Sequence, residues 1–311
     1  HHRTRWLMLF HYPQDTPLEL GPTAILPRSQ YLNVQRPEGI AELPLSGAAG
    51  TVTLVHYDLL HRGIANTSDQ MRYMAKFLFT RMTEPQAPSW NHQQAAWAPT
   101  GDPQDTIWQH LWDWHRGVAD TAAPSLDLPI GTLAERLGRE AEIEGLGAAY
   151  ELGARGAEAV PALIEALRSE SEAAPRNAAY AFNRIGPAAV PALLDAAGDA
   201  EPKVRARALD ILGDMGLSAA EAARPLIGHL RDETEDPRRR AAEALGTAGQ
   251  TASDIAGPLG AALAGDLSGE VRRNAALSLA RLGSKAAEAV PALARSVGDE
   301  NHYVRGFSVY A

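Results

Sequence analysis

The chain has 311 residues, and at roughly 150 residues per domain this length suffices for about two domains, each with its own core. Hydrophobic residues make up 45%, and no apolar run approaches the roughly 18 residues that span a bilayer, which excludes an integral membrane protein. The formal charge of −9 argues against nucleic-acid binding, and the absence of cysteine excludes disulfides and thiolate metal sites. Since the N-terminus shows no secretory pattern, we expect a cytoplasmic, multidomain protein.

The first 85 residues show a pattern of strands and turns. Residues 5–12 are aromatic and apolar, and residues 51–57 and 71–80 alternate between apolar and polar side chains. Gly-Pro and Asn-Thr-Ser-Asp segments separate these runs and are typical of turns. The pattern predicts an all-β sandwich or jelly roll for residues 1–85.

Two motifs in this region are more specific than its strands. The first is Gly-Pro-Thr-Ala-Ile-Leu-Pro-Arg-Ser-Gln at residues 21–30. The second begins with His-Arg-Gly at residues 61–63 and continues through Asn-Thr-Ser at 66–68 to Arg72. Together they resemble the phytanoyl-CoA dioxygenase family, although arginine and glutamine replace a glycine and a histidine of that family's first motif. The resemblance implies an incomplete double-stranded β-helix and an Fe(II)- and 2-oxoglutarate-dependent dioxygenase that oxidises or hydroxylates a small-molecule substrate.

The resemblance also implies roles for three residues. His61 corresponds to an iron ligand, Arg72 to the arginine that binds 2-oxoglutarate, and Trp6 loosely to an aromatic residue beside the cosubstrate. These residue types suit the chemistry, because Fe(II) takes imidazole ligands and a guanidinium pairs well with the far carboxylate of a diacid. If residues 62–70 connect two antiparallel strands, His61 and Arg72 lie on neighbouring strands. The alternatives are a hairpin histidine, a surface arginine and a core tryptophan.

The family's other two iron ligands form a His-x-Asp pair, and the chain lacks this pair ahead of residues 5–12. His56 and Asp58 have the same spacing and share one face of a strand. His61 is an odd number of residues away and points to the other face unless a bulge intervenes. The chain begins with histidine and stops within a helical pattern, so we expect a fragment whose missing pair lies upstream.

Residues 86–127 form a tryptophan-rich linker, which predicts a helix over residues 103–116. One face of this helix is expected to pack against the β region or the first repeat, and a stacking platform for a ligand is the alternative. The apolar residues of that face are Ile107, Trp108, Leu111 and Trp112.

Residues 128–311 repeat themselves, and such periodicity determines the architecture directly. A Val-Pro-Ala-Leu motif or a variant of it recurs in steps of 30, 34, 33 and 33 residues, starting with Pro161. Arginines recur in phase with it, and glycines follow the apolar segments, where a helix C-terminus accepts a left-handed residue. These glycines are Gly186, Gly213, Gly246 and Gly283. Each unit predicts two short helices, which bury their apolar faces only by stacking.

This pattern resembles short bacterial-type HEAT repeats, and the resemblance implies an all-α solenoid that binds a protein partner. Four aspartates keep the same period, each six residues before an arginine, which predicts a ladder of charge-assisted hydrogen bonds between repeats. A ligand-binding row of arginines is the alternative. The aspartate–arginine sets are Asp199 and Arg205, Asp232 and Arg238, Asp266 and Arg272, and Asp299 and Arg305.

The sequence therefore predicts a 2-oxoglutarate-dependent oxygenase region joined to a HEAT-repeat domain, with Fe(II) as cofactor and neither nucleic acid nor membrane as partner. The first alternative is a non-catalytic scaffold, in which a degenerate β-helix persists and the concave face of the solenoid binds. A repeat protein that acts on a bound chromophore is a further alternative, but no residue in the sequence is dedicated to it.

Overall fold

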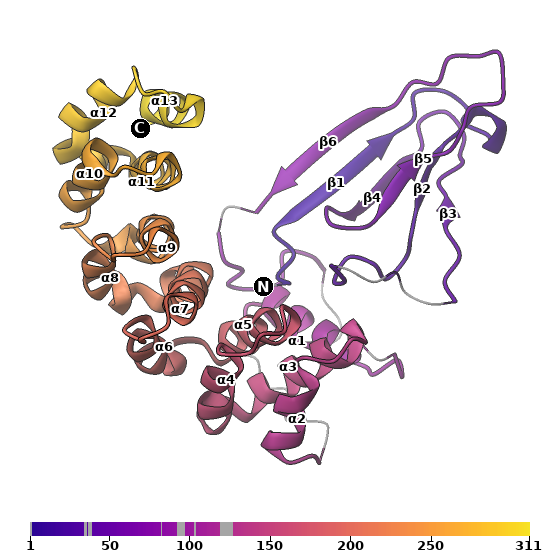
Figure 1. The fold of residues 1–311 in the computed structure, drawn as a ribbon. Coiled ribbons are helices and arrows are strands. Elements are labelled where there is room, and N and C mark those ends of the chain that lie inside the picture. Colours follow the sequence, from indigo (N-terminus) through magenta and orange to yellow (C-terminus); the bar gives the residue numbers. More distant parts are fainter. Residues whose placement is uncertain are drawn as a thin grey trace. The chain divides into compact units, whose positions relative to one another are not determined.

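The computed structural model of the protein describes residues 2–33, 36, 39–81, 83–91, 97–102, 104–118 and 127–311 (Figure 1). The chain divides into two compact units, which we call the β unit (residues 2–122 and 141–143) and the solenoid (123–140 and 144–311). Each has its own cluster of buried apolar side chains. Within the described ranges, no helix combines the length and the apolar character needed to cross a membrane.

The β unit contains two small antiparallel sheets. The first has the order β4-β1-β6 and consists of β4 (Val52–His56), β1 (Trp6–His11) and β6 (Ala75–Thr80). The second has the order β3-β2-β5 and consists of β3 (Leu43–Pro44), β2 (Thr23–Ile25) and β5 (His61–Gly63). The predicted strands are confirmed as β1, β4 and β6. The double-stranded β-helix expected for residues 1–85 is not shown, because these short strands form only two three-stranded sheets.

Alternation along β1 determines which side chains form the core of the β unit. Met8, Phe10 and Tyr12 are each no more than 1% exposed, and Met8 lies opposite the buried Val55 of β4. Apolar residues of the second sheet and its loops, such as Ile25, join the same cluster. The period of two therefore directs one face of β1 into a shared core.

The predicted helix over 103–116 is confirmed as α1 (Asp105–His115). Asp105 accepts hydrogen bonds from the backbone N–H groups of Thr100 and Gly101, at 2.8 and 2.7 Å, which fixes the start of the helix. Trp114 is buried, and its indole N–H donates to Glu84 at 2.7 Å. The α1 helix thus packs within the β unit.

The solenoid consists of helix pairs, with the first helices along one side and the second helices along the inner, concave side (Figure 1). Prolines lie in the first turns of the first helices, where the missing N–H has little cost. Two helices, α2 (Ile130–Arg136) and α3 (Glu142–Arg155), precede five pairs. The pairs are α4 (Val160–Ala166) and α5 (Ala173–Ile185), α6 (Val190–Ala197) and α7 (Pro202–Met215), α8 (Ala223–His229) and α9 (Glu235–Leu245), α10 (Ala256–Gly265) and α11 (Gly269–Leu282), and α12 (Val290–Ser296) and α13 (His302–Tyr310).

The predicted ladder between repeats is confirmed. Arg205 Nε and Nη2 donate to the Asp232 carboxylate at 2.7 and 2.8 Å, and Nη1 donates to the Asp199 carbonyl in its own repeat. Arg238 with Asp266 and Arg272 with Asp299 repeat this arrangement. These three guanidinium groups are engaged within the fold, so a ligand-binding row of arginines is not what the period encodes.

Candidate functional site

The structure places His61 on β5, opposite Ile25 of β2, with an exposed side chain. Its Nδ1 lies 2.8 Å from the Leu59 carbonyl oxygen, and its ring centroid lies 5.8 Å from that of Phe10. One ring nitrogen is therefore held by the backbone, which orients the imidazole at the end of the second sheet.

Arg72 lies in the connection between β5 and β6, where its Nη1 donates to the Gly21 carbonyl oxygen. Gly21 has a φ of 70°, and a Cβ there would lie 2.7 Å from the Asn66 amide nitrogen, so the loop requires glycine at this position. Gly21 is four residues before Ile25, roughly 13 Å of extended chain at the usual strand rise. In the described chain no contact joins Arg72 to His61, and the common binding of one diacid by both stays a prediction.

The remaining predicted ligands are also dispersed. Trp6 is 48% exposed, with its ring centroid 5.8 Å from that of Tyr57, and its role beside a cosubstrate stays a prediction. His56 belongs to the first sheet, whereas His61 belongs to the second, so the two do not form a local triad with Asp58. Among the residues that the structure describes, no three His, Cys, Asp or Glu side chains are grouped to hold a metal ion. The donor set that Fe(II) chemistry needs does not fit here.

A polar groove of about 510 Å³ lies on the second-helix side of the solenoid, across α5, α7 and α9. A smaller recess of about 120 Å³ shares its α7 carboxylates and extends it toward α11. We call this surface the concave groove. Its charged and aromatic lining residues are Arg176, Tyr180, Lys203, Arg207, Asp210, Asp214, Asp236 and Arg240.

A stripe of four charges on α7 forms the centre of the concave groove. Lys203, Arg207, Asp210 and Asp214 follow one another at spacings of four, three and four residues, which places them on one face of the helix. The cations lie toward the N-terminus of α7 and the carboxylates toward its C-terminus. The helix dipole favours the reverse order by about 0.3–1 kcal/mol per charge, so this arrangement does not serve the stability of α7.

Neighbouring groups fix and tune these charges. Arg207 Nη1 donates to the carbonyl oxygens of Leu167 and Ser169 at 2.6 and 2.9 Å, which holds the guanidinium at one end of the groove. Burial raises the pKa of Asp210 to about 6, although the ion pair with Arg240 opposes this shift. Asp214 is exposed, and no cation of the described chain pairs with it.

Sequence reasoning missed the concave groove. The repeat period directed attention to positions that recur in every unit, whereas the charges of the groove differ from one second helix to the next. Arg176 illustrates the difference, because its step of 29 residues removes it from the ladder and places it in the groove wall. The charge stripe on α7 was the signal that could have revealed the surface.

Comparison with known families concerns only the solenoid. Residues 160–246 match the family described as HEAT repeats, and residues 271–299 match the PBS lyase HEAT-like repeat. The solenoid therefore carries HEAT repeats, which confirms that part of the prediction. A search of curated proteins finds no match to the chain.

Several solved structures are similar to part of the chain. The complex of CpcE and CpcF of phycocyanin lyase from Nostoc sp. PCC7120 is 24% identical, with 48% of this chain and 96% of that chain covered and a TM-score of 0.39. YibA of Escherichia coli is 19% identical, with 58% and 69% covered and a TM-score of 0.43. An engineered protein is 19% identical, with 58% and 94% covered and a TM-score of 0.39.

These findings correct the prediction of an enzyme. Both family matches are to HEAT repeats, and no 2-oxoglutarate oxygenase is among the structures named above. No match supports a phytanoyl-CoA dioxygenase domain in residues 1–85. The prediction that the chain is a 2-oxoglutarate-dependent oxygenase is therefore wrong, and its source is physical: a short histidine-to-arginine motif specifies a local turn without specifying the ligands around it.

Proposed function

We propose that the protein is a non-catalytic HEAT-repeat scaffold that binds a partner protein through the concave groove. The observation that carries this proposal is the charge stripe on α7, which opposes the helix dipole and leaves the Asp214 carboxylate without an intramolecular cation. Sequences depart from local stability rules mainly at functional surfaces. The stripe is therefore best understood as recognition of charges on another molecule.

The stripe also specifies the chemistry of the partner. Lys203 and Asp214 are eleven residues apart, about 16 Å along the helix axis. A partner segment that follows this axis pairs a carboxylate with the Arg207 end and a lysine or arginine with the Asp210 and Asp214 end. Mixed charges of this kind favour one orientation of the partner over its reverse.

Selection from a random peptide library displayed on phage, with the full chain as bait, tests the proposal. We expect selected peptides to carry an acidic and a basic residue separated along the sequence. Asp214→Arg should weaken their binding about tenfold or more, because a like charge then faces the peptide's cation. The matched control is Asp195→Arg, the same charge change at an exposed position of α6 on the opposite side of the solenoid.

Two results contradict the proposal. The first is a set of selected peptides that bind the Asp214→Arg variant as tightly as the Asp195→Arg variant. The second is a selection that yields no peptide with both charges. In either case the concave groove does not bind a partner of the stated chemistry.

A further inference from the structure

A second surface, separate from the concave groove, follows the turn between α10 and α11. It consists of two recesses, one of about 490 Å³ lined by α8 and α10 and one of about 590 Å³ between α10 and the end of α12. The recesses share Gly265 and Asp266, so they form a continuous surface, which we call the edge groove. None of its lining residues belongs to the concave groove.

The floor of the edge groove is apolar. Ile227 and Leu230 of α8 face Ala261 and Ala262 of α10 across the first recess. Between the two recesses, Leu267 is 96% exposed on the turn. A leucine held this far into water beside an apolar recess is suited to contact another molecule, since burial of a leucine side chain contributes about 1.5–3 kcal/mol.

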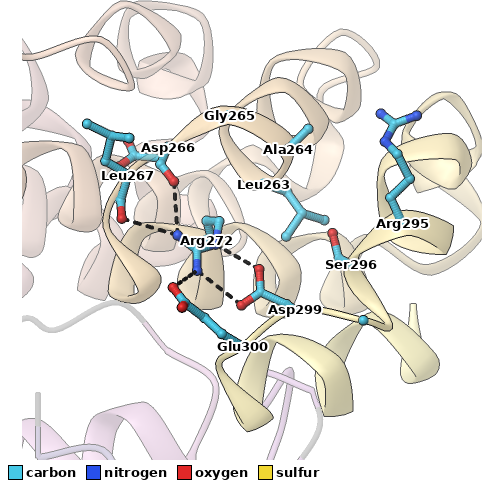
Figure 2. A pocket seen from close by; sticks show the side chains of 11 residues that line it. Leu263, Ala264, Gly265, Asp266, Leu267, Arg272, Arg295, Ser296, Asp299 and Glu300 are labelled. Carbon is cyan, nitrogen blue, oxygen red and sulfur yellow. Dashed lines mark hydrogen bonds and ion pairs between the residues drawn. The ribbon is translucent and has the colours of Figure 1, made fainter.

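The charges around the edge groove are unbalanced in one direction. Figure 2 shows Arg272 bonded to Asp299 and Glu300, whereas Arg295 extends from α12 with no bond to the residues drawn. Asp266 is bound by Arg238 of the ladder at 2.7 Å. Its carboxylates thus already have arginine partners inside the fold.

Two cations of the edge groove have no such partner. Among the described residues, neither Arg231 at the first recess nor Arg295 at the second forms an ion pair. This local excess of positive charge contrasts with the formal charge of −9 for the whole chain. An acidic partner is therefore repelled by most of the molecule and attracted here, which favours a specific contact.

We propose that the edge groove binds a short segment of a partner protein in which apolar side chains are flanked by carboxylates. The apolar side chains pack on Leu267 and in the recess beside Ala261, and the carboxylates pair with Arg231 and Arg295. Together with the concave groove, this surface makes the solenoid a scaffold with two separate binding faces.

Peptide selection with counter-selection tests this inference on the full chain. A random peptide library on phage is first depleted on the Leu267→Asp variant and then selected on the wild-type chain. We expect the recovered sequences to contain leucine, isoleucine or phenylalanine with flanking aspartate or glutamate. Their affinity should fall about tenfold with Leu267→Asp or with Arg231→Glu plus Arg295→Glu. Leu217→Asp, at a leucine that is 57% exposed elsewhere, is the matched control and should leave it unchanged.

Three results overturn the inference. Recovered peptides without flanking carboxylates do so, and so does a selection that yields no peptide sensitive to Leu267→Asp. The third is a wild-type dimer in sedimentation velocity that Leu267→Asp dissociates, because the occupant is then a second copy of this chain. Binding that Asp214→Arg abolishes and Leu267→Asp leaves intact supports only the concave groove, so the two surfaces are tested separately.

Discussion

The Arg205 guanidinium divides its donors between two repeats. Its Nη1 group binds the carbonyl oxygens of Asp199 and Ala200, which end the first helix of its own unit, and the other edge binds Asp232 of the next unit. The Arg205 and Asp232 side chains are only 10% and 8% exposed. Because only a planar guanidinium presents donors on both edges in fixed directions, lysine cannot replace arginine at this position.

Removal of this side chain should therefore destabilise the solenoid strongly. Arg205→Ala leaves the Asp232 carboxylate buried without a cation, which costs about 3–5 kcal/mol for a buried pair. The free energy of unfolding from urea titration, followed by circular dichroism, measures the change. Arg205→Lys should recover only part of the loss.

Arg224 provides the matched control for Arg205. It forms an ion pair with Asp254 at 3.0 Å, but the two side chains are 79% and 46% exposed. Exposed pairs contribute about 0–1 kcal/mol, so Arg224→Ala should change stability little. Equal effects of the Arg205 and Arg224 substitutions would mean that the ladder is not a stabilising feature.

Asp210 should give the protein a measurable pH dependence. Burial raises its folded-state pKa from 3.8 to about 6, so between these values the folded chain holds a proton that the unfolded chain has released. The contribution of Asp210 to the free energy of unfolding therefore falls as pH rises through this window. Asp210→Asn removes the titration, and the variant should gain stability relative to wild type from pH 4 to about pH 7. Urea unfolding at several pH values measures this difference, and parallel curves for the two proteins would contradict the prediction.

At the scale of helices, the glycines that end apolar segments have two different roles. Gly186 and Gly283 have φ values of 72° and 54°, as predicted for residues that end a helix in the left-handed region. Gly213 instead lies inside α7, and Gly246 has a φ of −75°. A Cβ on Gly213 would lie 3.1 Å from Ala244 Cα of the next second helix. These two glycines allow close approach of neighbouring helices, a role that depends on packing and is not visible in a single repeat.

Gly246→Ala should accordingly destabilise the contact between α9 and α11. The added Cβ would lie 2.8 Å from the Ser278 Cα atom, so backbone has to move, and overpacking of this kind costs about 1–3 kcal/mol. Thermal unfolding measures the loss. Gly306→Ala on α13 is the control, since nothing lies within 4 Å of its Cβ position, and alanine should be neutral or stabilising there. A variant pair with equal melting temperatures would show that the helices adjust without cost.

The strands and the helices also differ in how far their sequence patterns reach. Alternation identified the runs that became β1, β4 and β6, because the period of two is a local property. Which strands pair, and how many form a sheet, depends on contacts between distant segments, so the same runs did not determine whether a complete β-helix forms. His61 and Arg72 illustrate this limit: their spacing was known, but the contact between Arg72 and Gly21 was not predictable from it.

For the molecule as a whole, the repeat period was the most informative part of the sequence. It predicted the helix pairs and the ladder, because each repeat contacts mainly its neighbours and the same solution recurs along the chain. The two grooves could not be predicted in this way, since they arise where individual repeats differ from the consensus. The sequence therefore predicts the scaffold better than the surfaces with which we propose it binds.

The nearest-neighbour architecture also bears on the proposed division into residues 1–85, 86–127 and 128–311. One cluster of buried side chains runs through the solenoid from Leu133 to Val304, and a separate cluster serves the β unit. Since each repeat depends on its neighbours, a chain of residues 128–311 alone should fold and keep its helical circular dichroism. Its urea midpoint should match that of the helical transition in the full chain. A shortened fragment that loses helicity, or unfolds at a clearly lower urea concentration, would show that the solenoid depends on the β unit and that the boundary at residue 128 is misplaced.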